Sequence, residues 1–355
     1  MSEWKKCKLG DIVQINYGKS LPEHKRTIGN VPVFSSAGIT GWHDAPLVKT
    51  HGIILGRKGT IGTVYYSDEP FFCIDTAYYI EPNELKYDLR YLYYLLQTLG
   101  LKDLNEDSAV PGLNRNTAYD QDVILPSVPE QRAIAAILSS FDDKIDLLHR
   151  QNKTLESLAE TLWRKMLDED SNPTIVNLGE IIDLYDSKRI PLSSIQRNKM
   201  KEGVLYPYYG AAKIMDYINK YIFKGEYLLL GEDGTVQTEE GFPILQLATG
   251  KFWVNNHTHV ITAKGPFNNF LLYLILKKTV ISHIITGAVQ PKINQVNLKS
   301  LEIEIPSRER IEKLALLTEE FWAKIQQNKN QINAAEKLRD TLLPKLMNGE
   351  INVEL

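Results

Sequence analysis

The sequence has very little cysteine and no long apolar run. Its 355 residues include two cysteines, Cys7 and Cys73, which are too few for a disulfide framework or a zinc site, so a reducing cytoplasm is the expected location. The N-terminal segment MSEWKKCKLGD lacks the apolar core of a secretion signal. The longest apolar run, residues 270–276, ends at Lys277 and is far too short to span a bilayer. We therefore expect no membrane partner.

Sequence signatures of catalysis are also missing. There is no Asn/Asp-Pro-Pro-aromatic loop with a glycine-rich cofactor turn, which an adenine methyltransferase needs, and no Walker A sequence ending in Gly-Lys-Ser/Thr. There is no acidic-lysine nuclease triad either. Asn172-Pro173 is followed by Thr174 and predicts the end of a helix. These absences argue against an enzyme that acts alone, and no cofactor is expected.

The charge balance is ordinary but unevenly distributed. The net charge is −3, with 43% hydrophobic and 24% charged residues, as in a soluble globular chain of about two domains. This balance disfavours a protein that coats nucleic acid without specificity. Acidic residues gather in the helical segments, whereas basic residues gather in the others, for example at residues 24–26, 57–58 and 197–201. A specific reader with its basic residues on one face is compatible with this pattern.

The chain contains an internal duplication. KLGDI at residues 8–12 matches NLGEI at residues 177–181, and without a gap Lys19 then aligns with Lys188. Four further segment pairs follow in the same order: VPVFSSAGITGW with YPYYGAAKIMDY, IILGRKGTIG with LLLGEDGTVQ, AVPGLNR with AVQPKINQ, and DVILPS with EIEIPS. Such a repeat decides the architecture, because each copy is expected to fold in the same way.

Each copy has a β-rich part followed by a long helix. Glycine and proline punctuate short strands such as residues 52–55 and 227–230. A short helical stretch is expected at residues 89–99 and again at residues 269–279. The long helices are expected at about residues 129–168 and 308–347, each roughly 55–60 Å long at 1.5 Å per residue. Pro126 and Pro306 mark the strand-to-helix junctions.

One polar residue interrupts the apolar seam of the first long helix. Asn152 lies at the centre of a 4-3-4-3 pattern typical of a coiled coil, whose other members are Ile134, Leu138, Phe141, Ile145, Leu148, Leu155, Ala159, Leu162 and Met166. Gln151-Asn152-Lys153 recurs as Gln327-Asn328-Lys329 in the second helix. We interpret Asn152 and Asn328 as residues that fix the register of an antiparallel helix pair at a cost in stability. Alternatively, both amides point to solvent beside the seam.

These segments resemble a known family. The run PSVPEQRAIAAILSSFDDKIDLLHRQNKTLESLAETLWRKM at residues 126–166 is similar to the first conserved helical region of type I restriction–modification specificity subunits. KLGDI, LGRKGTIG and PGLNR resemble elements of the same family, so the resemblance covers essentially the whole chain. The second copy departs from the pattern, because Ser-Arg-Glu-Arg at residues 307–310 replaces Pro-Glu-Gln-Arg at residues 129–132. Its helix also carries about one extra turn after Asn328.

The resemblance implies an α+β fold with two β-rich target-recognition domains joined by two long antiparallel coiled-coil helices, related by an internal pseudo-two-fold duplication. The expected boundaries are residues 1–127 for target-recognition domain 1, 128–170 for conserved helical region 1, 171–306 for target-recognition domain 2, and 307–355 for conserved helical region 2. The implied function is a non-catalytic specificity subunit that reads a bipartite, asymmetric target on double-stranded DNA, with a spacer set by the coiled coil. Two modification (methyltransferase) subunits are the implied partners, and restriction–translocase subunits are optional further ones.

The turn at residues 56–62 is the best candidate for reading bases. Its glycines let the backbone approach DNA closely, and Arg57 and Lys58 project donors suited to guanine O6 and N7 or to phosphate. In the second copy the same positions are Glu232 and Asp233, acceptors suited to the N4 amine of cytosine. Opposite chemistry at equivalent turns is expected of paired readers for different half-sites. Alternatively, both turns are ordinary hairpins with solvated charges.

The remaining predicted contacts surround these two turns. Lys19, Lys188 and Arg189 are expected to bind phosphates, which position the protein without specifying a sequence. The full set of predicted DNA-binding residues is Lys19, Ser35, Ser36, Arg57, Lys58, Thr60, Asn114, Arg115, Lys188, Arg189, Lys213, Glu232, Asp233, Thr235, Lys292, Asn294 and Gln295. No catalytic residue and no metal ligand is predicted.

Two other clusters have ordinary structural interpretations. His257 and His259 place two imidazoles on one strand face, but no further ligand lies at a metal-like spacing, so we expect a structural or DNA-facing role. The tyrosines at 87, 91, 93 and 94 are expected in a helix core rather than in a base-stacking platform.

Two other functions stay open from the sequence. One is the recognition subunit of a restriction system whose partner chain fuses the methylase and the nuclease. The other is a duplicated coiled-coil adaptor that binds only proteins. The adaptor predicts no salt-dependent DNA binding even with a methylase present, whereas a DNA reader predicts a steep dependence on salt.

Overall fold

The structure is a computed structural model that describes residues 4–105, 112–287 and 289–353. Residues 109–111 and Ala288, at the start of the matched segments AVPGLNR and AVQPKINQ, lie outside the described residues. The chain forms two compact units: the first unit comprises Met1–Leu147 and Gln331–Leu355, and the second unit comprises Leu148–Asn330. Each long helix therefore contributes one part to each unit. Within the described residues, no helix combines the length and the apolarity needed to cross a membrane.

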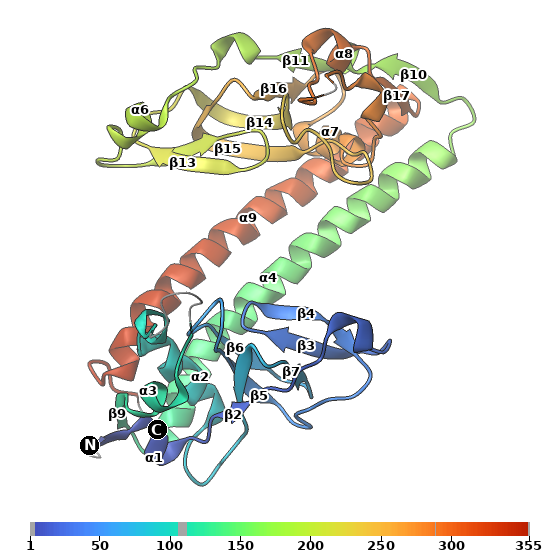
Figure 1. Cartoon of the computed structure of the whole chain (residues 1–355). Helices are drawn as coiled ribbons and strands as arrows, with labels where there is room; N and C mark the ends of the chain where they lie inside the picture. Colours follow the sequence, from blue (N-terminus) through green and yellow to red (C-terminus); the bar gives the residue numbers. More distant parts are fainter. Residues whose placement is uncertain (1–3, 106–111, 288, 354–355) are drawn as a thin grey trace. The chain divides into compact units, whose positions relative to one another are not determined.

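The first unit has many short elements before its first long helix (Figure 1). In chain order they are β1 (Lys5–Lys8), α1 (Leu9–Ile12), β2 (Asn16–Tyr17), η1 (Glu23–Lys25), β3 (Val31–Ser35), β4 (Gly38–His43), β5 (Gly52–Gly56), β6 (Val64–Ser67), β7 (Phe72–Cys73), β8 (Ala77–Ile80), α2 (Leu89–Thr98), η2 (Leu101–Asp103), α3 (Arg115–Tyr119) and β9 (Asp122–Leu125). The long helix α4 (Val128–Asp168) follows.

The second unit repeats this order. Its elements are β10 (Thr174–Asn177), α5 (Leu178–Ile181), β11 (Ile182–Leu184), η3 (Asp186–Lys188), α6 (Ser194–Asn198), β12 (Tyr206–Tyr209), β13 (Ile214–Ile218), β14 (Phe223–Gly231), β15 (Leu245–Val254), β16 (Thr258–Ala263), α7 (Asn269–Leu276), η4 (Ser282–Ile284), α8 (Gln295–Lys299) and β17 (Glu302–Ile305). The second long helix, α9, spans Arg308–Met347. Both long helices have nearly the predicted bounds.

The two units contain the same sheet, once interrupted and once continuous. The first unit has a four-stranded sheet in the order β2-β8-β5-β6 and a three-stranded sheet in the order β4-β3-β7, whereas the second has one six-stranded sheet in the order β11-β16-β14-β15-β12-β13. Strands β6 and β7 are separated by a segment that contains Pro70, which has no backbone N–H to continue a ladder. Strand β15 runs unbroken and pairs with β14 and, in parallel, with β12. The duplicated fold is therefore present in both units.

Each unit buries its own apolar core. In the first, Ile53 and Leu55 of β5 pack with α2 and with Leu138 of α4, and in the second Leu228 and Leu230 of β14 pack with α7 and with Trp163 of α4. The core prediction is confirmed for Tyr87, just before α2, and for Tyr91 and Tyr94 within it, which are at most 3% exposed, whereas Tyr93 is partly buried against the same core. Each core holds a sheet, a short helix and a long helix in fixed positions.

The motif Pro-Glu-Gln-Arg at the start of α4 has a local structural explanation. The Glu130 carboxylate accepts hydrogen bonds from the N–H and hydroxyl of Ser127, at 3.0 and 2.7 Å. The buried amide of Gln131 donates to the Pro126 carbonyl and accepts from the N–H of Asp88, the N-cap of α2. These bonds satisfy groups that a helix start would otherwise leave unpaired, and they link α4 to α2.

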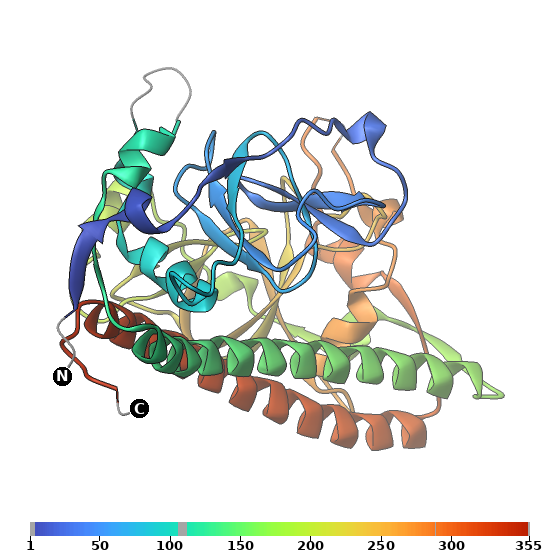
Figure 2. The ribbon, with the colours of Figure 1, turned by 90° about the horizontal axis from the view of Figure 1, so that it is seen from below.

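Within each unit, the two long helices run antiparallel (Figures 1 and 2). In the first unit Arg339 of α9 donates to Asp142 of α4 at 2.6 Å, and Leu346 and Met347 join the core that contains Ile134 of α4. In the second unit the other parts pair: Ala159, near the end of α4, packs with Trp322 and Ile325 of α9, and Arg310 donates to the carbonyls of Met166 and Glu169.

The two seam asparagines meet in the second unit. The Asn328 amide nitrogen donates to Asn152 Oδ1 at 2.9 Å and lies 3.3 Å from Gln151 Oε1. The Asn328 side chain is fully buried, so it does not point to solvent, and its amide oxygen accepts no hydrogen bond from any residue that the structure describes. An amide pair so placed costs stability, and any shift of the helices would leave both amides unpaired.

A double-mutant cycle tests whether these amides act as a pair. Asn152→Leu leaves the buried Asn328 amide without its main acceptor, which we expect to lower the free energy of unfolding by about 1–3 kcal/mol. Asn152→Leu combined with Asn328→Leu removes both amides and should be at least as stable as the wild type. Urea unfolding, with hydrogen exchange of second-unit amides as the readout, measures the stability of both variants. Equal stability of the single and double variants would contradict the pairing.

Candidate nucleic-acid interface

The turns after β5 and β14 occupy equivalent places in the two units. Gly56 pairs with Ala77 across β5 and β8, as Gly231 pairs with Thr258 across β14 and β16. The N–H of Arg57 donates to the Thr76 carbonyl, and the N–H of Glu232 donates to the equivalent His257 carbonyl. Gly59 and Gly234 both have φ near +80°, which glycine adopts without strain. The predicted match of the two turns is therefore present in the backbone.

The first unit has a small polar cavity beside its turn. Its volume is about 220 Å³, and its lining residues are Tyr17, Arg57, Lys58, Tyr78, Gly112, Leu113, Asn114 and Arg115. The Tyr78 hydroxyl donates to the Leu113 carbonyl at 2.9 Å and closes the inner end. Burial raises the pKa of this hydroxyl, so Tyr78 stays a neutral donor. Four residues predicted to bind DNA thus line one cavity: Arg57, Lys58, Asn114 and Arg115.

Stacking on tyrosine holds the two guanidinium groups of this cavity. Arg57 and Arg115 lie 4.9 and 4.8 Å from the centre of the Tyr17 ring, and Arg57 is also 5.7 Å from the centre of the Tyr78 ring. Arg57 donates to the Asp75 carbonyl and Arg115 donates weakly to the Ile15 carbonyl. Among the described residues, no carboxylate forms a salt bridge with Arg57 or Arg115. The contacts described for both arginines are therefore with rings and backbone carbonyls.

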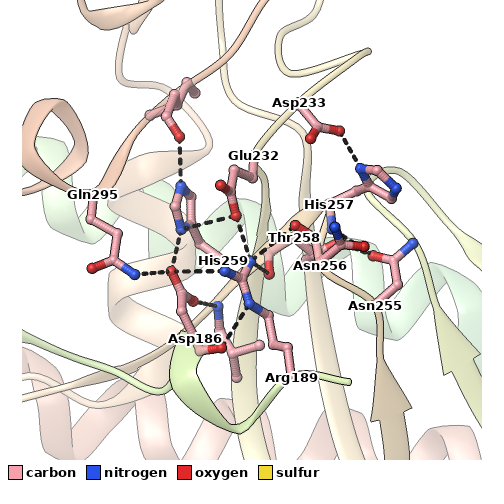
Figure 3. Close-up of polar contacts among 12 residues, drawn as sticks. Asp186, Arg189, Glu232, Asp233, Asn255, Asn256, His257, Thr258, His259 and Gln295 are labelled. Carbon is pink, nitrogen blue, oxygen red and sulfur yellow. Dashed lines mark hydrogen bonds and ion pairs between the residues drawn. The ribbon is translucent and has the colours of Figure 1, made fainter. Parts of the chain in front are cut away.

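In the second unit the same positions hold a buried ionic network (Figure 3). The ungapped match aligns Tyr17 with Asp186, and strand register aligns Tyr78 with His259. His259 Nδ1 is 2.6 Å from Asp186 Oδ2, and the Gln295 amide donates to the same oxygen at 2.8 Å. His259 Nε2 lies 2.8 Å from the Ile293 carbonyl, and in the first unit the Tyr78 hydroxyl lies 2.9 Å from the equivalent Leu113 carbonyl.

Arg189 supplies the positive charge of this network. Its Nη1 lies 2.5 Å from Glu232 Oε2 and donates to the Thr258 carbonyl at 2.7 Å, while its Nη2 is 3.5 Å from Asp186 Oδ2. The side chain is only 11% exposed. Arg189 was predicted to bind phosphate, but in this structure its N–H groups are directed into the protein.

The charge of Asp186 is stabilised by several donors. Burial alone would raise the pKa of this carboxyl, but the hydrogen bond and charge of His259, the N–H of Val260 and the charge of Arg189 together lower the pKa below its usual value. Asp186 therefore remains ionised although its side chain is 3% exposed. The His259 side chain is fully buried, so of the two histidines in His257-Thr258-His259 it has the structural position.

Among the described residues, Asp186, Glu232 and His259 form the group that most resembles a metal site. Ligand atoms of Asp186, Glu232 and His259 all lie within 4.8 Å of one another. The Arg189 guanidinium contacts both carboxylates, so it already provides the cation that a metal would supply. This arrangement is explained as an internal salt-bridge network.

Outside the network, the second turn presents a different set of groups. His257 is half-exposed, and its Nδ1 lies 2.6 Å from Asp233 Oδ1. The ammonium of Lys292, also half-exposed, is 3.4 Å from Glu232 Oε1. The Glu232 carboxylate, predicted to accept from a base, is therefore used by Arg189 and Lys292, while His257 and Lys292 remain accessible.

Other predicted residues serve the local backbone or lie on the surface. The Asn114 and Asn294 side chains cap α3 and α8 by accepting from the N–H groups of Asn116 and Asn297. Ser36 is buried, and the Ser35 hydroxyl donates a hydrogen bond to the Gly38 carbonyl in the same turn. Seven members of the predicted set outside the two turns are exposed: Lys19, Asn114, Lys188, Lys213, Lys292, Asn294 and Gln295. Within the turns, Lys58, Thr60 and Thr235 are exposed.

Comparison with known proteins assigns the family. The profile of the type I restriction modification DNA specificity domain matches residues 1–157 and 171–337, one match for each copy of the repeat. The chain belongs to this family. Each match covers the β-rich part of one copy and most of the long helix that follows it, up to residue 157 in α4 and residue 337 in α9.

Relatives in this family cover most of the chain. The specificity subunit of the type I restriction enzyme MjaIX from Methanocaldococcus jannaschii is 27% identical over 343 residues, which are 85% of this chain and 78% of the relative. The EcoDI specificity subunit from Escherichia coli is 22% identical over 404 residues, 99% of this chain and 89% of the relative. The crystal structure of a type I system S subunit from M. genitalium matches with a TM-score of 0.67 and 19% identity, over 97% of this chain and 96% of that one. This last likeness supports the fold.

Removal of the internal cation tests the network. Arg189→Met leaves two nearly buried carboxylates side by side, so we expect the stability of the second unit to fall by about 3–5 kcal/mol. Lys292→Met is the matched control, because its ion pair is half-exposed and should contribute less than about 1 kcal/mol. Hydrogen exchange of the β14 and β16 amides measures both. Similar small effects of the two substitutions would contradict the assignment.

The low pKa of Asp186 predicts acid sensitivity of the second unit. Because the folded pKa lies below the unfolded value of about 3.9, the contribution of the carboxylate is fully present above that value and is lost as pH falls through the folded pKa. The stability difference between the wild type and Asp186→Asn should therefore shrink below about pH 4. Urea titrations at pH 7, 5, 4 and 3 measure this, and a difference independent of pH would contradict it.

Proposed function

We propose that this chain is the DNA-reading subunit of a type I restriction–modification complex, without chemistry of its own. The supporting observation is that both units keep one scaffold and one loop register, yet they reverse the charge at equivalent positions. Two units with the same fold but different side chains suit a bipartite target with two different half-sites, because the halves of such a site are related across the duplex axis.

The roles of the parts follow from this assignment. Residues 1–127 and 171–306 act as the two target-recognition domains, and residues 128–170 and 307–355 act as the helical regions that set the spacer. Two modification subunits supply methylation, and restriction–translocase subunits add cleavage where they are present. Phosphates of double-stranded DNA are contacted by exposed lysines, namely Lys19, Lys58, Lys188 and Lys213. The chain acts in the cytoplasm of a prokaryotic host, where DNA is directly accessible.

Methylation mapping of a host genome with and without this chain is the most direct test. A bipartite motif that disappears with the chain supports the proposal, and the map gives both half-sites, the spacer and the modified base. Unchanged methylation, together with DNA affinity that does not vary with salt when a modification subunit is present, would instead support a protein-binding adaptor. A reader with about six phosphate contacts should lose roughly 1,000-fold in affinity between 50 and 200 mM salt.

The spacer role of the helices can be tested by lengthening both together. A heptad inserted after Asn152 and another before Asn328 keeps the antiparallel seam in phase and adds about 10 Å at 1.5 Å per residue. We expect the preferred spacer to grow by about three base pairs, at about 3.4 Å per pair, with both half-sites unchanged. The control carries the two heptads with polar residues at the seam positions. An unchanged spacer in a folded, DNA-binding variant would refute the role.

A further inference from the structure

The equivalent pockets of the two units differ in what they leave open. In each unit a side chain from an inner strand, Tyr78 or His259, reaches the carbonyl of the loop residue Leu113 or Ile293. The surrounding positions then diverge: Tyr17, Arg57 and Arg115 in the first unit align with Asp186, Glu232 and Gln295 in the second. One backbone arrangement therefore carries a cationic pocket in one unit and a salt-bridged network around two carboxylates in the other.

We propose that the first-unit pocket reads the acceptor edge of a guanine through Arg57 and Arg115, whereas the second-unit pocket is closed by Arg189 and admits no base. This inference rests on the proposed function. It also adds Tyr17, which stacks with both guanidinium groups, as the residue that positions them.

The charge reversal argues for a base rather than a phosphate. Every half-site presents phosphates, so a phosphate pocket would keep its positive charge in both units. Bases differ between half-sites, so a position that reads a base in one unit can lose that role in the other, as in the change from Arg57 and Arg115 to Glu232 and Gln295. The difference between the two units thus separates two roles that the chemistry of one arginine leaves open.

The donor pattern of the pocket selects guanine among the bases. Arg57, Lys58 and Arg115 offer only N–H donors, and the Asn114 side-chain oxygen already accepts from Asn116. Within the described part of the chain, the buried Nε of Arg115 has no hydrogen-bond partner, and the Arg57 guanidinium donates to the Asp75 carbonyl. In the major groove guanine presents two adjacent acceptors, O6 and N7, whereas adenine presents one acceptor and one donor.

The closure of the second pocket comes from one residue. Arg189 follows η3 and fills the space between Asp186 and Glu232, while the aligned residue in the first unit is Ser20, which is exposed and too short to reach across. The second unit must then contact bases through side chains outside the network. Of these, His257 and Lys292 are half-exposed. The two heads read DNA from different depths of the same scaffold.

Substitutions that keep or remove charge test the reading role. The full chain with its modification subunit is equilibrated with a randomised double-stranded DNA library, and the variants are Arg57→Gln, Arg57→Lys, Arg115→Gln and Arg115→Lys. A guanine edge needs the planar fork of arginine, so both Lys and Gln variants should lose preference for one G·C pair of one half-site, by about 10- to 100-fold. The slope of affinity against salt should stay nearly constant for the Lys variants, and the other half-site should be unaffected.

Arg90→Gln is the matched control. Arg90 lies in the same unit and stacks on Tyr66, but it is paired with Asp68 outside the pocket, so its loss removes one positive charge without touching the site. Thermal unfolding of all variants separates binding from folding, and Tyr17→Phe, which keeps the stacking ring, should retain the base preference. Tyr17→Ala should weaken it.

Each other outcome overturns the inference in a distinct way. If Lys variants bind like the wild type while Gln variants lose affinity for all sequences and reduce the salt slope by about one, the pocket holds a phosphate. If folded variants keep both affinity and preference, the pocket lies outside the interface. If the wild-type complex selects no sequence at all, the proposed function itself fails, which is distinguishable from both results.

Discussion

A single hydrogen bond repeated in both units holds the candidate interface together. It links an inner strand of the sheet, through Tyr78 or His259, to the loop carbonyl of Leu113 or Ile293. The bond requires only an O–H or N–H donor of suitable length at that strand position, so a phenol and an imidazole can both form it. Because the loop position is fixed by this bond, the neighbouring side chains are free to change from cationic to anionic without moving the backbone.

The change in chemistry has unequal structural costs. In the first unit the guanidinium groups are stabilised by ring faces and backbone carbonyls, and both arginines are partly exposed. In the second, Asp186 and Glu232 are almost removed from water, and such charges are tolerated only when opposite charges and hydrogen bonds satisfy them. Arg189 and Gln295 meet this need. The second unit has thus gained a rigid internal network where the first has an open cavity.

Features with a local or periodic signal could be predicted from the sequence. Heptad spacing gave the long helices to within a residue, and the repeated Gln-Asn-Lys pointed to two asparagines that are hydrogen-bonded in the structure. The pocket walls were missed, because Tyr17 and Tyr78 meet only through the pairing of β2 with β8. The ungapped match of Tyr17 with Asp186 was a usable signal. Arg189 looked like a surface cation, since nothing local indicates that it turns toward Glu232.

The division of each long helix between two units affects how the protein is made. The core of the first unit contains Leu346 and Met347, and Trp4 lies against Gly349, so residues from both ends of the chain complete it. During translation, the second unit has all of its residues available before the first, although the ribosome starts with the latter. The core of the first unit therefore stays incompletely packed until the last few turns of α9 have been synthesised. A chain truncated within these turns would fail to fold its first unit while still containing every residue of the second.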